Sequence, residues 1–461
     1  MTVSRGFEQS LWNAVDRLRG SLDLQAAQQL LLCALFLRCL ADSPGDPSPG
    51  GLAWHEVLTS ASHRGEAGRA LVAALDHAWT ASNPHSGWMP SESIPLGPAA
   101  EPFLREVLWF VNGVADPRQV FDDFLEGFSS SKTGGDYFTP RHLVQLMVAL
   151  VEPQHGERIL DPACGSGGFL VEAARYARER QGPDAAVRPT GRDVNTQARQ
   201  TAWMNLTLHG LEADLGTHPI DSLRADDTPA ADFDVVLANP PFNLKMFGDE
   251  LRWPDPRWRY GVPPRSNANF AWVQHVVSKL TEHGRGAMLL PDGAASAGGV
   301  SRSIREGLVR DGVLAAVVAL PPGVVAHTSI RTSIWLFAHE RPSARGQHVL
   351  LVNAWDLGGT ARPGRRSVST EDVERITNTY RSWRGDTYQD QPGWCRSVSF
   401  DELAARDFDL QPIAYTGTPA TQDDDDASAS QRVTELTGEL YELFAEAARL
   451  EAELRFRLGD V

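Results

Sequence analysis

The stretch RILDPACGSGGF, residues 158–169, is the part of this sequence that most directly predicts its fold. Its first four residues predict a short buried strand that ends in Asp161, and a glycine-rich turn follows. Glycines permit a tight turn and let the backbone approach a ligand at the carboxyl edge of a sheet. Residues 168–181 then have the apolar spacing of a helix. This order is typical of a doubly wound α/β domain.

The same alternation continues on the C-terminal side of this stretch. From about residue 133, short apolar runs bounded by Gly, Pro and Asp alternate with helical stretches, which predicts a parallel, doubly wound sheet. The expected strands are 158–161, 188–194, 217–222, 233–238, 285–291, 314–321, 333–340 and 348–356. The expected helices between them are 168–181, 196–210, 269–284 and 300–312. No elements are assigned between 357 and 415, where the pattern is irregular.

The chain divides into four predicted parts. Residues 1–128 carry apolar positions three or four apart and predict an all-helical N-terminal domain, and 129–417 form the α/β domain. Residues 418–431 predict an acidic polar linker, and 432–461 a C-terminal helix for subunit assembly. That helix has a heptad seam, which favours docking against helices of another chain. The alternative is a helix folded back on its own domain. The seam consists of Val433, Leu436, Leu440, Leu443, Ala447, Leu450 and Leu454.

Composition and charge constrain the class of protein. With 461 residues, 42% apolar and 22% charged, the chain has a globular composition. Its net charge of −16 is unusual for a protein that binds nucleic acid, so any DNA contact must come from local clusters or from a partner subunit. No apolar run is long enough to span a membrane, and the start of the chain lacks the features of a signal peptide, so a cytoplasmic protein is expected. Four cysteines without zinc spacing predict neither a metal site nor disulfides.

Three aspartates follow successive predicted strands and indicate the kind of ligand. Asp161 ends the first, Asp193 the second and Asp221 the third. An acid at the second strand commonly binds ribose hydroxyls. Carboxylates on neighbouring strand ends disfavour a pyrophosphate and favour an adenosine that carries an amine and a sulfonium. Each aspartate alone could also be a turn or capping residue.

The fourth strand ends in NPPF, residues 239–242. An exocyclic amine of a base is a poor nucleophile unless acceptors orient its hydrogens. Asn239 offers a side-chain carbonyl, Pro240 a backbone carbonyl, and the two prolines fix the backbone before the substrate arrives. Phe242 offers a face on which a flipped base can stack. As a structural element alone, the motif is also a good strand terminator.

Taken together, these motifs resemble a known family. GDYFTP (135–140), DPACGSGGF (161–169) and NPPF (239–242), in that order, resemble amino-group DNA methyltransferases. The flanking LWNAVDRLRGSLD, YGVPPRSNANFAWVQH and FDLQPIAY are similar to the modification (M) subunit of type I restriction–modification systems. The similarity covers roughly residues 8 to 416.

The resemblance implies a Rossmann-like S-adenosylmethionine-dependent methyltransferase domain with an N-terminal all-helical domain and a C-terminal helix. It also implies methyl transfer to adenine N6 in double-stranded DNA. A separate specificity (S) subunit, bound through the C-terminal helix, would set the target sequence, and a second M subunit would complete the complex. A restriction (R) subunit is left open, and no membrane is involved.

The resemblance also assigns roles to residues. The donor would lie against Tyr137, Phe138, Thr139, Pro140, Asp161, Ala163, Gly165, Gly167, Asp193 and Asp221. Of these, Thr139 would lie near the methionine carboxylate, Asp161 and Gly165 beside the methionine part, Asp193 at the ribose and Asp221 at the adenine ring. Catalysis would fall to Asn239, Pro240, Pro241 and Phe242.

Departures from the family pattern keep alternatives open. The family usually has Glu where Asp193 stands, and Ile220 replaces a usual glycine. An orphan or phage-defence DNA amino-methyltransferase, acting on adenine N6 or cytosine N4 without a nuclease, is one alternative. Others are a protein-glutamine methyltransferase and a non-catalytic scaffold that binds DNA or the donor. The basic and aromatic insert 245–265 predicts either a contact with DNA or the flipped base, or an ordinary packed loop.

Overall fold

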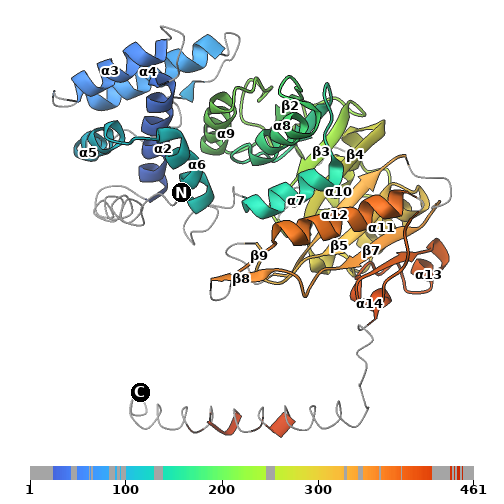
Figure 1. The fold of residues 1–461 in the computed structure, drawn as a ribbon. Coiled ribbons are helices and arrows are strands. Elements are labelled where there is room, and N and C mark those ends of the chain that lie inside the picture. Colours follow the sequence, from blue (N-terminus) through green and yellow to red (C-terminus); the bar gives the residue numbers. More distant parts are fainter. Residues whose placement is uncertain are drawn as a thin grey trace. The chain divides into compact units, whose positions relative to one another are not determined.

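A computed structural model describes most of the chain. The described residues are 24–42, 49–61, 63, 66–82, 89–90, 94, 100–128, 139–245, 255–325, 330–340, 346–362, 365–385 and 387–417, together with 437, 438, 441, 444–446 and 449. The predicted α/β class, with helices at the N-terminal end, is confirmed (Figure 1). None of the helices in these ranges is long and apolar enough to cross a membrane.

The elements described in the N-terminal part are all helices. The helices are α2 (Leu24–Ala41), α3 (Pro49–Ser60), α4 (Ala67–Ser82), α5 (Ala100–Asn112) and α6 (Pro117–Phe128). Helix α2 is buried along most of its length because apolar residues surround it on several sides. It also packs against α9 (Thr196–Leu208) of the α/β part, where Phe36 meets Trp203 edge to face and Gln29 donates to Gln200. The predicted domain boundaries stay predictions.

A single eight-stranded sheet forms the centre of the α/β part, in the order β10-β7-β5-β6-β4-β3-β1-β2. Its strands are β1 (Arg158–Asp161), β2 (Arg188–Gly191), β3 (Phe233–Ala238), β4 (Leu280–Pro291), β5 (Leu314–Ala319), β6 (Thr332–Ala338), β7 (Val349–Asn353) and β10 (Cys395–Val398). A small hairpin, β8 (Gly359–Arg362) and β9 (Arg365–Ser367), lies outside the sheet.

The prediction of a parallel sheet is wrong for one predicted strand, β6, and a second antiparallel strand, β10, lies where no element is predicted. β6 pairs antiparallel with both β4 and β5, and β10 pairs antiparallel with β7. A parallel neighbour usually requires a helical crossover, and the connection 320–331 holds no helix among its described residues, so β6 returns in the opposite direction.

Other predicted elements also differ from the structure, and the strands predicted at 188–194 and 348–356 end earlier, at Gly191 and Asn353. Residues 217–222 form no strand, because Pro219 has no backbone N–H to donate and Ile220 donates instead to the Asp193 carbonyl at 2.9 Å. The predicted helix 269–284 ends at Lys279, since Leu280 is already the first residue of β4 and pairs with Phe233 of β3.

Helices cover both faces of the sheet. Alternate residues of β3 enter different cores: Val235 and Leu237 face one, and Val236 and Ala238 the other. The first core packs against α7 (Arg141–Val151), α8 (Gly168–Gln181), α9 (Thr196–Leu208) and α12 (Thr370–Arg384). The second packs against α10 (Asn269–Lys279), α11 (Val300–Arg310) and α13 (Phe400–Ala404). The short helices η2 (Asp292–Ala294) and α14 (Ile413–Thr416) complete the described elements.

The chain forms two compact units, Met1–Thr416 and Gly417–Val461. In the second unit, the described residues after Gly417 are helical, and Tyr441 and Phe444 among them are exposed. The predicted linker 418–431 and all seven seam residues of the predicted heptad helix lie outside the described residues.

Candidate functional site

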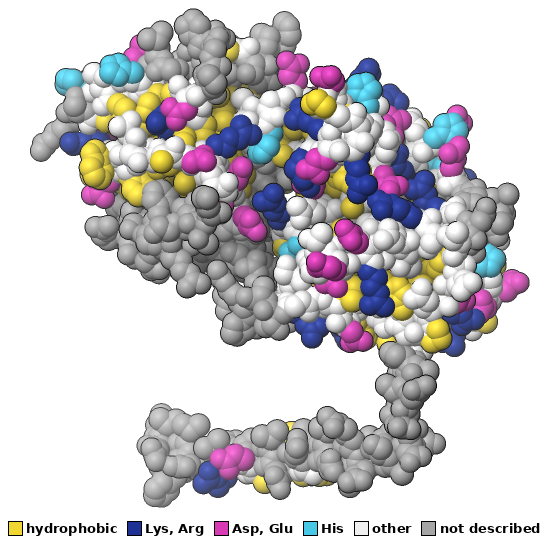
Figure 2. All heavy atoms as spheres, in the orientation of Figure 1, with side chains coloured by type: hydrophobic (Ala, Val, Ile, Leu, Met, Phe, Trp, Pro, Cys, Tyr) yellow, Lys and Arg dark blue, Asp and Glu magenta, His cyan; other side chains and the backbone are white. Residues whose placement is uncertain are grey.

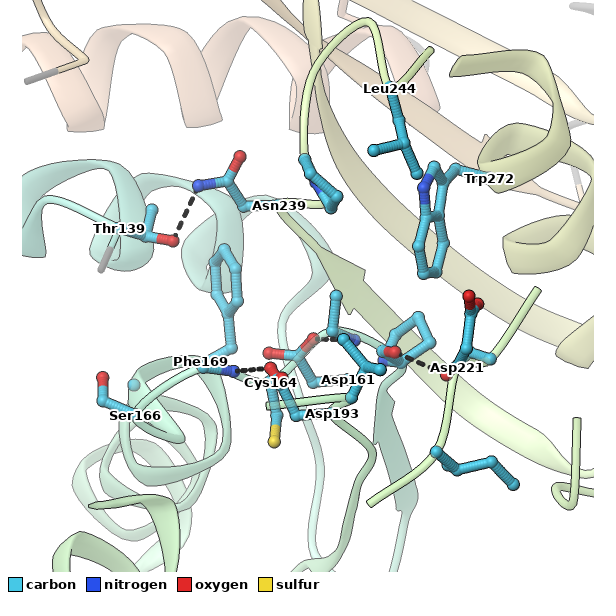
Figure 3. Close-up of a pocket in the computed structure, with 18 of the residues that line it drawn as sticks. Thr139, Asp161, Cys164, Ser166, Phe169, Asp193, Asp221, Asn239, Leu244 and Trp272 are labelled. Carbon is cyan, nitrogen blue, oxygen red and sulfur yellow. Dashed lines mark hydrogen bonds between the residues drawn. The ribbon is translucent and has the colours of Figure 1, made fainter. Parts of the chain in front are cut away.

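A cavity of about 500 Å³ lies at the carboxyl ends of β1 and β3 (Figure 3). Many of the residues predicted for the site line it: Thr139, Asp161, Ala163, Gly165, Asp193, Asp221, Asn239 and Pro241. Four others, Pro140, Gly167, Pro240 and Phe242, are described but do not line it. Tyr137 and Phe138 lie outside the described residues. Cavities at this edge of an open α/β sheet commonly bind ligands.

Two buried carboxylates lie together in the wall of this cavity. The Asp161 Oδ1 atom accepts the Ala163 N–H at 3.1 Å, and Asp193 accepts the N–H groups of Gly165 at 2.9 Å and Asn195 at 2.7 Å. Burial raises the pKa of Asp161 to about 8, assisted by the charge of Asp193, and burial also raises the pKa of Asp193. A bound cation would therefore stabilise the ionised form of both carboxyl groups.

The glycine turn is supported from behind by helix α9. Gly165 and Gly167 adopt positive φ angles of 54° and 76°, which side chains rarely allow. A Cβ on Gly167 would touch Ala202 of α9 at 3.4 Å, and the Asn205 amide donates to the Ser166 carbonyl at 2.8 Å. The turn therefore has little freedom to move away from the cavity.

Asp221 reaches the cavity from a loop, although its predicted strand is absent. Its Oδ1 atom accepts the Leu223 N–H at 3.0 Å, and the neighbouring Ser222 hydroxyl donates to the Pro162 carbonyl at 2.7 Å. The loop is thus bonded directly to the turn that carries Asp161.

Arg257, from the insert 245–265, supports this same loop. Its guanidinium donates to the Ser222 carbonyl at 2.8 Å and the Leu223 carbonyl at 2.7 Å, and a double contact with Asp255 fixes its orientation. The next residue, Trp258, is 5% exposed. Arg257 and Trp258 therefore fit the prediction of an ordinary packed loop. Residues 246–254 of the insert lie outside the described residues.

The NPPF segment lies beside the cavity with its amide already oriented. Asn239 is half-buried and its Nδ2 atom donates to the Thr139 hydroxyl at 2.9 Å (Figure 3). Because the nitrogen is engaged, the Oδ1 atom is left to accept a hydrogen bond from a substrate. Thr139 therefore contacts the NPPF segment itself.

Leu244 and Trp272 are among the residues that line the cavity and were not singled out from the sequence. Figure 3 shows their side chains pointing toward one another, with Trp272 near Asp221. Trp272 is 5% exposed, and its indole N–H has no hydrogen-bond partner among the described residues. A flat apolar wall of this kind suits a purine ring. The sequence signal for Trp272 was an aromatic residue near the start of the helix that follows the NPPF segment.

Charges of both signs are intermixed on the surface. Figure 2 shows Lys and Arg side chains interspersed with Asp and Glu on the face in view. Several surface arginines are engaged in ion pairs, among them Arg175 with Glu172 and Glu179. The described residues in view on that face therefore form no extended basic surface free of acidic side chains.

Comparisons with known proteins agree with this geometry. Residues 118–424 match a family described as N-6 DNA Methylase. The chain is 36% identical over 350 residues to the type I restriction enzyme HindI methylase subunit of Haemophilus influenzae, covering 74% of this chain and 77% of that one. It is 30% identical over 349 residues to the MjaIX methylase subunit of Methanocaldococcus jannaschii, covering 73% of this chain and 62% of that one.

Solved structures show the same fold. The type I restriction–modification methyltransferase subunit of Streptococcus thermophilus aligns with a TM-score of 0.71 at 21% identity, over 90% of this chain and 100% of that one. A second structure, from work on complex assembly and conformational transition of the type I system, aligns with a TM-score of 0.63 at 20% identity, over 98% and 99% of the two chains.

Proposed function

The chain belongs to the N-6 DNA methylase family, among the methylase subunits of type I restriction enzymes, and from that premise we propose how its cavity transfers a methyl group to DNA. Membership confirms the resemblance predicted from the motifs at 135–140, 161–169 and 239–242. The proposed donor is S-adenosylmethionine and the proposed acceptor is the N6 amine of adenine. The observation that carries the proposal is the oriented Asn239 amide beside a cavity that holds two buried carboxylates.

The residues of the cavity fit S-adenosylmethionine. Asp161 and Gly165 would hold its methionine part, Asp193 its ribose, and Asp221 and Trp272 its adenine ring. The two carboxylates with raised pKa values match a ligand that carries an ammonium and a sulfonium charge. Bound there, the donor would supply an electrophilic methyl group.

The NPPF segment would prepare the acceptor. The Asn239 Oδ1 atom and the Pro240 carbonyl would each accept one hydrogen of the N6 amine, which turns its lone pair out of the ring and toward the methyl group. Phe242 would stack on the flipped adenine. As the new N–C bond forms, the bond between the methyl group and the sulfonium sulfur of the donor would break, the sulfur would leave as a neutral thioether, and the amine would lose one proton to solvent.

A substitution of Arg257 tests whether the loop that carries Asp221 contributes to donor binding. Arg257→Lys is expected to weaken binding of S-adenosylmethionine about tenfold, because lysine cannot bond both carbonyls and Asp255 together, and a bond to a charged group contributes roughly 1.5–3 kcal/mol. Titration calorimetry measures the affinity. Arg259→Lys, on the same insert but 68% exposed in its side chain, is the matched control. Equal affinity in both variants would contradict the supporting role of Arg257.

The buried Cys164 argues against a different chemistry. Methylation at cytosine C5 needs a thiolate beside the base, whereas burial raises the pKa of the Cys164 thiol well above its usual value. Its sulfur packs instead against Gly191, where an added Cβ would approach it to 3.0 Å. Cytosine N4 uses the same amine-orienting geometry as adenine N6, so only the product distinguishes these two acceptors.

The proposed partners are double-stranded DNA, a specificity (S) subunit, a second M subunit and, where a nuclease exists, a restriction (R) subunit. The net charge of −16 supports a partner that supplies the DNA-reading surface. The heptad seam of 432–461 supports docking against helices of the S subunit.

Removing residues 432–461 tests this docking. The shortened chain is expected to keep its melting temperature, since 417–461 form a compact unit of their own, and to co-purify poorly with the S subunit. Calorimetry and pull-down of the co-expressed subunits measure the two effects. Undiminished co-purification would place the contact elsewhere.

The function itself is tested by single-molecule sequencing of genomic DNA from a host that expresses the chain, alone and together with the product of its neighbouring gene. N6-methyladenine at a two-part motif, present only with the partner, is the expected result. N4-methylcytosine would change the acceptor. No mark in either case, despite donor binding, would favour a non-catalytic scaffold.

A further inference from the structure

The side chains of three asparagines meet at the residue that follows the NPPF segment in the sequence. Asn243 follows Phe242 and adopts a left-handed backbone conformation, with a φ angle of 51°. Its Oδ1 atom accepts the Asn267 Nδ2 and the Asn269 Nδ2, both at 3.0 Å. Its backbone N–H donates to the Asn269 Oδ1 atom, also at 3.0 Å. We refer to Asn243, Asn267 and Asn269 as the asparagine clasp.

The hydrogen bonds of the clasp fix the orientation of two amides. The Asn269 oxygen must face the Asn243 N–H, and the Asn267 oxygen accepts the Asn269 N–H at 2.9 Å. Both nitrogens are therefore directed at the Asn243 oxygen. Asn269 is 4% exposed and begins α10, so the clasp is anchored on a helix packed against the sheet.

The clasp holds one end of a short loop whose other end is Asn239. Pro240, Pro241 and Phe242 lie between Asn239 and Asn243. Leu244, which follows Asn243, lines the donor cavity. The Ala268 N–H also donates to the Leu244 carbonyl, at 3.3 Å. The Thr139 bond orients Asn239 at the first end, and the clasp fixes the backbone at the second.

We propose that Asn267 and Asn269 are positioning residues for methyl transfer, which act through Asn243 to hold Phe242 and the NPPF backbone where the target base is received. This inference rests on the proposed function. Asparagine tolerates the left-handed conformation at 243 better than most residues, and its side chain supplies the acceptor that joins the two amides. Loss of that acceptor, or of the Asn269 donor, would let the loop drift, and a misplacement of about 1 Å can slow a reaction ~100-fold.

Three variants in the complex with the S subunit test the clasp. Asn269→Asp exchanges the Nδ2 donor for an oxygen that repels the Asn243 oxygen. Asn243→Gly removes the acceptor but accepts the positive φ without strain. Both are expected to lower kcat roughly 10- to 100-fold at saturating donor and DNA. Asn243→Asp keeps an acceptor for both amides and is expected to stay within about threefold of the wild type. Donor affinity should be unchanged within about twofold in all three, because none touches Asp161 or Asp193.

A charge-matched control and a structural measurement complete the test. Asn378→Asp, exposed on α12, adds the same charge at a distance. Hydrogen exchange of the peptide 239–245 in the purified chain should quicken in Asn243→Gly and Asn269→Asp and not in Asn378→Asp.

Specific outcomes overturn the proposal. Undiminished kcat in Asn269→Asp and Asn243→Gly would do so, as would donor affinity that falls in step with kcat, or exchange equal to that of the wild type. Absence of N6-methyladenine with the wild-type complex would instead overturn the proposed function and with it the clasp's role in the reaction. Hydrogen exchange would then still report whether the clasp holds the loop.

Discussion

Replacing Asn239 by alanine is expected to lower kcat for methyl transfer by roughly 10²- to 10³-fold, while the affinity for S-adenosylmethionine stays within about twofold. A preorganised hydrogen-bonding group aimed at the reacting atom contributes on this scale. The amide lies at the edge of the cavity, whereas the carboxylates that would hold the donor's charges are Asp161 and Asp193. Single-turnover methylation of target DNA and calorimetric donor binding measure the two quantities separately.

Thr139→Val provides the graded control for this experiment. It removes the hydroxyl that accepts from the Asn239 amide and leaves a side chain of nearly the same shape. The expected loss in kcat is smaller, about tenfold, because the acceptor oxygen is still present but no longer held in one orientation. Donor binding that disappears in Asn239→Ala would contradict the catalytic role and make Asn239 a residue of the donor site.

The sequence predicted those parts of the site that are local in the chain. Strand β1, the glycine turn and helix α8 follow one another within 158–181, and the structure has each at its predicted bounds. Strand β3 and the NPPF segment are equally local, and β3 also has its predicted bounds. Such segments are specified by their own apolar runs, glycines and prolines, so a pattern read along the chain is sufficient.

The parts that were missed depend on contacts between distant residues. Arg257 donates to the carbonyls of Ser222 and Leu223, 35 and 34 positions away, in the loop that carries Asp221. Asn269 contacts Asn243 across 26 positions. The pattern of residues that are adjacent in the sequence does not indicate such contacts. Asp221 shows the reverse case: its strand is absent, yet hydrogen bonds of Ile220 and Ser222 bring it to the cavity. The antiparallel β6 was missed because buried strands of either direction have the same apolar run.

Donor binding at pH 7 is expected to release close to one proton from the protein, and Asp161→Asn is expected to abolish that release. Burial raises the pKa of Asp161 to about 8, so the carboxyl is mostly protonated in the free chain at pH 7. A bound ammonium or sulfonium favours the carboxylate and lowers its pKa again. The proton must then leave. Calorimetry in two buffers of different ionisation enthalpy counts the protons released.

The sign of the pH dependence follows from the same shift. Below pH 8, raising the pH ionises more Asp161 in the free chain, so donor affinity should rise by up to about tenfold per pH unit. Near and above pH 8, this gain ends, and the donor's own amino group, with an ordinary pKa of about 7.7–8.0, begins to lose its charge. Asp161→Asn should therefore weaken binding most at pH 8 and least at pH 6, while Glu282→Gln, whose side chain is 85% exposed, should follow the wild type at every pH. An equal loss at both pH values would show that Asp161 is ionised throughout, and that the Ala163 N–H outweighs the burial that raises its pKa.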